Sequence, residues 1–276
     1  MKEKILSRVK EHYDYLVSKG YEVVFTALQG SQNYGLDEYS EEYQSDVDTK
    51  SIVLPSFDSF AESKQPTSKI EIMNNNEHAE VKDIRVMFEM FLKENLSYIE
   101  LLYTDYIVIN PIYEKEVKEL IEMRNAIVEF NKSQFIKCIA GMSYEKQKAL
   151  CHPYPSLIQK IEKYGYDGKQ LSHCVRLLEF LTRYINGVPV SECYRTRERK
   201  LLMNYKKQLD EQGFPLSVSR AKEICDNTVA EIIKLKDKAI AEIEDEKCDR
   251  ATVSALKQIK IKILKDYFKR ELREEE

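Results

Sequence analysis

Two aspartates separated by one residue, Asp46 and Asp48, are the side chains in this sequence best suited to chemistry. In an extended strand, residues two apart point to the same face, so both carboxylates would lie together while Val47 turns into the core. Carboxylates held this close repel each other unless a cation lies between them. Such a pair suits Mg²⁺ or Mn²⁺, which adds water and substrate phosphates as ligands. The alternative is a solvated pair in an edge strand or a turn.

A glycine and a serine, Gly30 and Ser31, follow an apolar run at 21–28. Glycine lets backbone N–H groups approach an anion closely, and a serine hydroxyl can cap a helical turn or contact a phosphate. The pattern predicts a phosphate cradle and a metal pair on adjacent strands. The connection at 32–44 contains Gly35 and four acidic residues, which predicts a flap or a substrate-contacting insertion.

The order of strand, Gly-Ser, and strand with Asp-x-Asp resembles the arrangement by which the DNA polymerase beta superfamily of nucleotidyltransferases holds a nucleoside triphosphate. The resemblance rests on Gly30, Ser31 and the SDVD stretch that contains Asp46 and Asp48. It implies a small mixed-sheet, palm-like domain in an α+β chain. It also implies Mg²⁺ or Mn²⁺ as cofactor and an NTP as substrate. The connection between the two halves of the motif is longer here than in many members.

Enzymes of this kind generally use a third carboxylate from a later strand, which completes the metal site and deprotonates the attacking hydroxyl. The segment HAEVKDIR contains two candidates. Glu80 shares a strand face with His78 and Lys82 by alternation, whereas Asp83 directly precedes a helical run and has the position of an N-cap. We predict Glu80 as the third ligand and base, and keep Asp83 as the alternative third carboxylate.

Two further stretches resemble the predicted RNA-repair-pathway branch of the same superfamily. In the first, Asn95 and Glu100 match an Asn followed by a Glu-Leu-Leu element. The second, KYGYDGKQLSHCVRLLEFL, matches a helical-domain signature at Asp167, Lys169, His173 and Arg176. Together with the first motif, the matched stretches are roughly the first 55 residues, 77–113 and 160–190. This resemblance implies an RNA end, such as a tRNA, as the acceptor.

The helical signature also has a direct physical interpretation. Lys169, His173 and Arg176 are spaced by four and three residues, so they line one face of a helix. A cationic stripe of this kind can hold a triphosphate or an RNA backbone. We therefore predict nucleotide binding for these three residues together with Gly30 and Ser31. The alternative is a solvated basic helix face with a histidine at its boundary.

The elements that must position these residues fall into two groups. Apolar residues at helical spacing predict a first helix that ends near Gly20, and the β-branched stretches 21–28 and 46–54 predict neighbouring strands. A strand at 69–73 interrupts a predicted loop, and HAEVKD predicts a strand that leads into a helix. Beyond Pro111 the pattern is helical almost throughout. Its last two helices are predicted to close the second domain as an antiparallel pair, with an oligomer surface as the alternative. The predicted domains are 1–112, mixed α/β, and 113–276, helical.

Composition sets limits on partners and compartment. Lys and Arg number 43 against 47 Asp and Glu, so the net charge of −4 gives no bulk attraction to nucleic acid or to an anionic membrane. A nucleic-acid contact would need a local basic face, for which 195–207 is the best stretch. The 6 cysteines form no CxxC pair, and no apolar run approaches the roughly 18 residues of a spanning helix. We expect a soluble, cytoplasmic protein with reduced thiols.

These observations lead to one functional hypothesis and two alternatives. The hypothesis is a metal-dependent nucleotidyltransferase that uses an NTP and acts on an RNA end. The first alternative is a protein-modifying transferase of the AMPylating or toxin–antitoxin type. The second is a non-catalytic module that binds a nucleotide. The oligomeric state stays open.

Overall fold

The computed structural model describes residues 2–40, 44–243 and 249–274. The chain forms two compact units. The first comprises 1–33, 37–131 and 247–276, and the second comprises 34–36 and 132–246.

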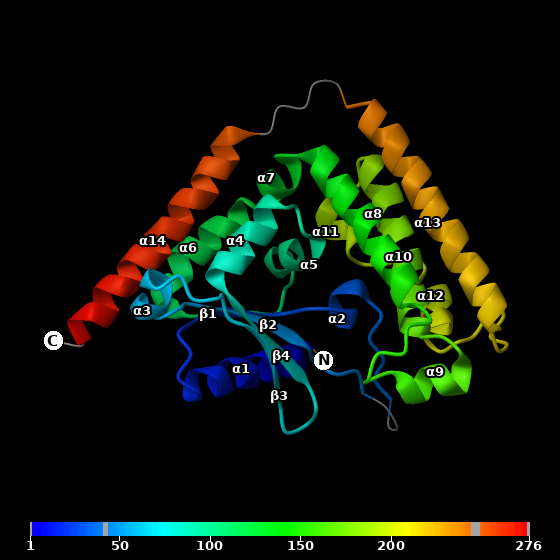
Figure 1. Ribbon diagram of the computed structural model, residues 1–276, viewed down its shortest axis with the longest axis horizontal. Helices are drawn as coiled ribbons and strands as arrows, with labels where there is room; N and C mark the ends of the chain where they lie inside the picture. The colour runs from blue at the N-terminus through cyan, green and yellow to red at the C-terminus, as the bar shows by residue number, and fades with distance from the viewer. Residues whose placement is uncertain (1, 41–43, 244–248, 275–276) are drawn as a thin grey trace. The chain divides into compact units, whose positions relative to one another are not determined.

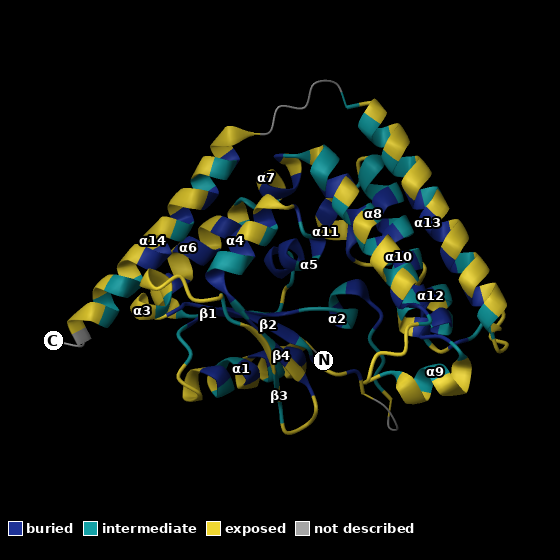
Figure 2. Cartoon of the chain, viewed as in Figure 1, coloured by how far each residue is buried: buried dark blue, intermediate teal, exposed yellow. Residues whose placement is uncertain are grey.

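A five-stranded sheet is the centre of the first unit (Figure 1). Its strands lie in the order β3-β4-β2-β1-β5. They are β1 (Val23–Leu28), β2 (Thr49–Val53), β3 (Ser68–Ile72), β4 (His78–Asp83) and β5 (Ile107–Ile109). β2 and β4 run parallel, and the other neighbours are antiparallel. Every residue of β1 and β2 is buried, as expected for central strands covered on both faces (Figure 2).

Helices cover both faces of this sheet. α1 (Lys2–Ser18) lies on one face, into which Ile5, Val9 and Leu16 are buried. On the other face lie α4 (Ile84–Leu92) and α5 (Leu96–Ile99) (Figure 1). The remaining elements of the unit are α2 (Ser31–Tyr34), α3 (Phe57–Ala61), η1 (Glu100–Leu102), η2 (Pro111–Tyr113), α6 (Glu114–Glu122), α7 (Arg124–Glu129) and α14 (Arg250–Glu274). The last residue of α2, Tyr34, belongs to the second unit. The mixed sheet with its helices confirms the predicted α+β class.

The second unit is helical. It contains α8 (Lys132–Ala149), α9 (Ile158–Tyr164), α10 (Gly168–Ile185), α11 (Val190–Cys193), α12 (Arg199–Lys206) and α13 (Val218–Ala241). α10 is central because α8, α12 and α13 all pack against it. Leu171 and Cys174 of α10 meet Tyr205, Cys225 and Val229 in the core. No helix in the described part of the chain is long and apolar enough to cross a membrane.

The division into units differs from the predicted boundary after residue 112. α6 and α7 belong with the sheet, and so does α14, which packs on α3, α4 and α6. α13 instead packs on α8 and α10. The prediction that the last two helices form one antiparallel pair was therefore wrong, because their apolar faces are buried in different units.

Gly168, the first residue of α10, lies so close to the backbone of α12 that we expect a larger residue there to lower the stability of the helical unit. A Cβ on Gly168 would lie 2.3 Å from the carbonyl oxygen of Tyr205 and 2.9 Å from that of Lys206. We expect Gly168→Ala to lower the free energy of unfolding by about 1–3 kcal/mol, because backbone atoms cannot move aside as a flexible side chain can. Urea denaturation followed by far-UV circular dichroism measures this change.

Gly141→Ala is the matched control. Gly141 lies inside α8, and a Cβ there meets no atom within 4 Å. Alanine in a helix interior is favoured over glycine by roughly 0.5–1 kcal/mol, so this variant should be more stable than the parent. Equal stability of the two variants would contradict the crowding seen at Gly168.

Candidate active site around the Asp46–Asp48 pair

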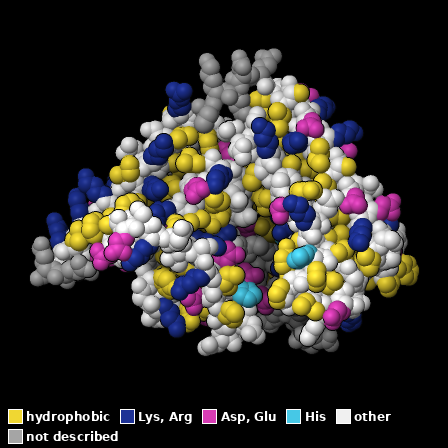
Figure 3. All heavy atoms as spheres, in the orientation of Figure 1, with side chains coloured by type: hydrophobic (Ala, Val, Ile, Leu, Met, Phe, Trp, Pro, Cys, Tyr) yellow, Lys and Arg dark blue, Asp and Glu magenta, His cyan; other side chains and the backbone are white. Residues whose placement is uncertain are grey.

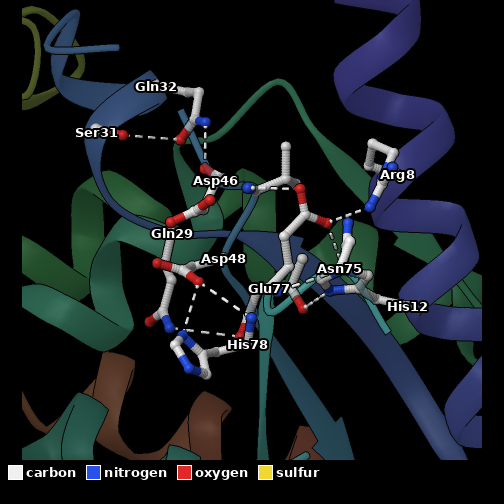
Figure 4. Close-up of polar contacts among 12 residues, drawn as sticks. Arg8, His12, Gln29, Ser31, Gln32, Asp46, Asp48, Asn75, Glu77 and His78 are labelled. Atoms are coloured by element: carbon white, nitrogen blue, oxygen red, sulfur yellow. Dashed lines mark hydrogen bonds and ion pairs between the residues drawn. The ribbon is translucent and has the colours of Figure 1, made fainter. Parts of the chain in front are cut away.

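The Gly-Ser turn, Gly30–Ser31, is held directly against the aspartate pair. The backbone N–H of Gln29 donates to the carbonyl oxygen of Asp48 at 3.0 Å. Gln32 Nε2 donates to the carbonyl oxygen of Asp46 at 2.7 Å (Figure 4). Because residues 29 and 32 flank the turn, these two bonds fix it beside the pair. The structure therefore brings together the two halves of the sequence motif.

The pair lies just before β2 rather than inside it, since the strand begins at Thr49. Alternation nevertheless extends through the segment: Asp46 is exposed, Val47 is buried, and Asp48 is half-buried. Figure 4 shows both carboxylates on the same side of the chain. The predicted shared face is thus present, although the residues that form it precede the strand.

A histidine from the neighbouring strand contacts this pair. The backbone N–H of His78 lies 3.2 Å from Asp48 Oδ1, and His78 Nδ1 lies 3.3 Å from the same oxygen (Figure 4). The sequence placed His78 on the face of Glu80 by alternation. It did not indicate that His78 would be the residue beside Asp48, because that depends on the parallel register of β4 against β2.

Glu80 lies on the expected face but at a different level of the sheet. It is paired in register with Lys50, and its carboxylate lies 3.5 Å from Lys50 Nζ and 3.8 Å from Lys82 Nζ. Within residues 2–40, 44–243 and 249–274, no three His, Cys, Asp or Glu side chains are grouped so that they could hold a metal ion. The predicted three-carboxylate cluster is therefore not preformed, because two lysines engage the third acid.

Asp83 has the structural role that its position predicted. It is the N-cap of α4, where its side chain accepts a hydrogen bond from the backbone N–H of Arg85. The Arg85 guanidinium contacts both carboxylate oxygens, at 2.9 and 2.6 Å. The residue is fully buried. These contacts do not support Asp83 as the alternative metal ligand.

A divalent cation fits the donor set that is present. Mg²⁺ in proteins usually takes one or two carboxylates and completes its octahedron with water and substrate phosphates. Asp46 and Asp48 supply two carboxylates on one side of the chain, and the former is exposed. The site therefore suits a cation that arrives together with a phosphate-bearing substrate.

The Gly-Ser turn is fixed by a carboxylate of the protein itself. Gly30 has a φ of 95°, as the turn requires, and its N–H donates to Glu100 Oε1 at 2.8 Å. Asn33 Nδ2 donates to the same oxygen at 2.7 Å. A phosphate at the turn would therefore meet the Ser31 hydroxyl, which donates to Gln32 Oε1 at 3.2 Å, rather than the Gly30 N–H. Sequence resemblance singled out Glu100, and the structure shows what it contacts.

A buried polar network holds the opposite face of the aspartate segment. Glu77 Oε1 accepts a hydrogen bond from the Val47 N–H at 3.0 Å. Its other oxygen lies 2.7 Å from Arg8 Nη2 and 3.1 Å from His12 Nε2. His12 Nδ1 lies 2.9 Å from Thr49 Oγ1 (Figure 4). The residues on either side of Asp48 are thus both anchored. No periodic pattern in the sequence indicated Glu77.

This network predicts a pH-dependent stability. Burial lowers the pKa of His12 below its ordinary value of 6.5, and the nearby Glu77 opposes that shift only in part. As pH falls below about 6.5, the unfolded chain binds a proton that the folded chain does not, so stability decreases. Each pH unit in this window removes up to about 1.4 kcal/mol until the folded pKa is reached. Urea denaturation at a series of pH values measures the slope.

The free energy of unfolding of His12→Gln should depend less steeply on pH than that of the parent protein. The control is His152→Gln, which removes a histidine whose side chain is exposed. If the parent and His12→Gln lose stability equally on acidification, His12 does not titrate as described.

The predicted cationic stripe lies on α10, in the second unit. Lys169 is exposed and His173 is half-buried, whereas Arg176 is only 3% exposed. The Arg176 guanidinium lies 3.6 Å from the ring centroid of Tyr34. The ring centroids of His173 and Tyr34 are 5.9 Å apart, in a T-shaped arrangement. The predicted stripe is therefore exposed to solvent at Lys169 and buried in the second unit at Arg176.

The basic stretch 195–207 gives less support for a nucleic-acid face. Arg197 pairs with Glu192 at 4.0 Å, and Lys206 Nζ donates to the carbonyl oxygen of Leu36 at 3.4 Å. On the face shown in Figure 3, Lys and Arg side chains are interspersed with Asp and Glu. The role of the connection at 32–44, as a flap or as a substrate-contacting insertion, stays a prediction. Residues 41–43 of this connection lie outside the described part of the chain.

Comparison with known proteins gives a weak similarity to a solved structure. No protein-family model matches the chain, and no curated protein matches it. Among solved structures, the chain is similar to a nucleotidyltransferase-like protein from Exiguobacterium sibiricum 255-15, with a TM-score of 0.33 and 14% sequence identity. The alignment covers 91% of this chain and 85% of that one. At this TM-score nothing about the site is transferred from that protein.

Proposed function

We propose that the protein is a metal-dependent nucleotidyltransferase. In this proposal it transfers a nucleoside monophosphate from an NTP to an acceptor hydroxyl and releases pyrophosphate. Asp46 and Asp48 are the metal ligands, and Glu80 is the base. The proposal takes an RNA end as the acceptor.

One observation carries the proposal. The Gly-Ser turn and the Asp46–Asp48 pair are joined by two hydrogen bonds, from the Gln29 N–H and from Gln32 Nε2. A turn that can contact phosphate and a carboxylate pair that suits Mg²⁺ are both needed to hold a metal–triphosphate complex. A solvated aspartate pair would not require this attachment to a Gly-Ser turn.

Each residue has a defined part in the proposed reaction. The Ser31 hydroxyl releases Gln32 Oε1 and donates to a phosphate oxygen. The hydrogen bonds from Gln29 and Gln32 keep both carboxylates on one side. When bound, Mg²⁺ neutralises phosphate charge and polarises the α-phosphoryl group. The acceptor oxygen bonds to the α-phosphorus as the bond to the β-phosphate oxygen breaks, so pyrophosphate leaves. The hydroxyl proton passes to Glu80, which must first release Lys50 and Lys82.

Labelled substrates test this proposal. The protein is incubated with each common ribonucleoside triphosphate, radiolabelled at the α-phosphate, with Mg²⁺ or Mn²⁺ and either total RNA or lysate protein. Label in RNA that is absent with Asp46→Asn/Asp48→Asn is the expected result. Label in protein would replace the RNA acceptor by a protein. Nucleotide binding without transfer would leave a non-catalytic module, and equal label with the double variant would remove the assigned site.

A further inference from the structure

The helical unit contains a buried arginine with unused hydrogen-bond donors. Arg176 is 3% exposed, and its Nε and Nη1 atoms are buried without a hydrogen-bond partner. No ion pair involves this guanidinium within the described residues. Burying a charged group without a counter-charge or hydrogen bonds costs several kcal/mol. A ligand that supplies both would remove that cost.

The contact with Tyr34 does not satisfy these donors. The guanidinium lies over the tyrosine ring at 3.6 Å from its centroid. Such stacking uses the face of the guanidinium, whereas its N–H groups point outward in its own plane. Tyr34 therefore orients Arg176 and leaves in-plane donors for an acceptor with several oxygens, such as a phosphoryl group.

Further cations lie on the same helix as Arg176 and on two helices that pack against it. Burial, followed by the charges of Lys169 and Arg176, lowers the pKa of Lys146 on α8. The pKa of His173 is lowered first by burial and then by Arg176, Lys146, Lys169 and Lys206. Four side chains that carry positive charge thus act on one histidine, which indicates a local excess of positive charge.

The acids nearest to this cluster have other partners. Asp167 Oδ1 accepts hydrogen bonds from Lys160 Nζ at 2.6 Å and from the Lys169 N–H at 3.1 Å, as the N-cap of α10. Glu145 is exposed and lies 3.5 Å from Lys148 Nζ. No carboxylate in the described chain forms an ion pair with Lys146 or Lys169. Asp167 and Glu145 raise the pKa of Lys146 through space, so they offset the positive charge of the cluster only in part.

We propose that Arg176, Lys146 and Lys169 form a metal-independent binding site for a polyphosphate within the helical unit. The proposal rests on the proposed function only for the source of that group, which would be the NTP or the released pyrophosphate. A compact group with several negative charges matches a buried guanidinium and two lysines whose charges act on the same part of the unit. An RNA backbone carries one charge per phosphate and would need an exposed stripe instead.

Calorimetric titration tests the site. Pyrophosphate, tripolyphosphate, ATP and adenosine are titrated separately into the full chain in the presence of EDTA, with sulfate as a simple anion. Binding of pyrophosphate and tripolyphosphate, with none of adenosine, is the expected result. ATP binding with no inorganic polyphosphate binding would overturn the proposal, because the site would then need the nucleoside. Binding of sulfate equal to that of pyrophosphate would also overturn it.

Two variants locate the binding. Arg176→Met and Lys169→Met should each weaken pyrophosphate binding by at least about tenfold, as expected for charged hydrogen bonds. Arg220→Met is the control, because Arg220 in the same unit is exposed and pairs with Glu223 at 2.8 Å. Lys169→Met removes an exposed side chain, so it remains informative if Arg176→Met does not fold. Unchanged binding in Lys169→Met and in a folded Arg176→Met would refute the assignment.

Two further measurements separate this site from the rest of the molecule. If Arg176 serves a ligand, ligand-free Arg176→Met should melt no lower than the parent, since methionine removes a buried unpaired charge. A structural arginine would give a lower melting temperature. Metal-free pyrophosphate binding should persist in Asp46→Asn/Asp48→Asn. If the double variant no longer binds pyrophosphate, the binding belongs to the aspartate pair. If pyrophosphate binding persists but the parent protein shows no nucleotidyl transfer, only the proposed function fails.

Discussion

Asp46→Asn/Asp48→Asn is expected to lower the rate of nucleotidyl transfer by at least about 1,000-fold, since bound metal supplies several kcal/mol of transition-state stabilisation. Asparagine keeps the size of each side chain and removes the negative charge that attracts the cation. The backbone bonds from Gln29 and Gln32 use carbonyl oxygens, so they survive the change. Transfer of α-phosphate label at saturating Mg²⁺ measures the effect.

Two observations separate this loss from general damage to the fold. Asp14→Asn is a control on the same unit, because its exposed carboxylate pairs with Lys10 on the surface of α1 and such pairs contribute little. Both variants should unfold at a urea concentration close to that of the parent. A double variant that retains transfer within about tenfold of the parent, a loss of only 1.4 kcal/mol, would show that the pair does not hold the catalytic metal.

The local part of the site could be predicted from the sequence because its geometry is set by neighbouring residues. Alternation alone places Asp46 and Asp48 on one face, and the structure retains that alternation ahead of β2. The capping position of Asp83 follows from its place between a strand and a helical run, and it caps α4. In each case, the deciding interaction spans only a few residues.

The rest depends on contacts between segments distant in the sequence. Whether Asp48 meets His78 or Glu80 is set by the register in which β4 runs parallel to β2. Glu80 lies on the predicted face of β4, but its carboxylate forms an ion pair with Lys50, the residue opposite it on β2. Alternation identifies the face of a strand, but it does not give the level at which two strands meet. This is why the predicted third carboxylate lies beside two lysines.

The same limit explains the misplaced elements. The short run Ile107–Ile109 forms β5, but it follows a long apolar helical pattern from which periodicity does not distinguish it. α14 has an apolar stripe that can be buried on any matching surface, and it lies against α3, α4 and α6. Arg176 and Lys146 lie on different helices, so no sequence spacing indicates that their charges meet.

Glu77→Ala should cause the largest loss of stability of the variants considered. Glu77 is 7% exposed, and its carboxylate accepts from the Val47 N–H, Arg8 Nη2 and His12. Removing the carboxylate leaves the Val47 N–H and His12 buried without an acceptor, which typically costs about 1–3 kcal/mol for each group. Arg8, whose side chain is 35% exposed, can turn to water instead. Urea denaturation near neutral pH, where His12 is uncharged in the fold, measures this cost.

The matched comparison is Glu89→Ala, which removes an exposed glutamate that pairs with Lys93 at 2.5 Å along α4. Exposed pairs of this spacing contribute little, so this variant should remain close to the parent. Glu77→Gln should fall between the two, because its amide oxygen can still accept from the Val47 N–H while the charge that pairs with Arg8 is lost. If Glu77→Ala costs no more than Glu89→Ala, the network does not anchor the aspartate segment. In that case, the orientation of the two carboxylates must come from the hydrogen bonds of Gln29 and Gln32 alone.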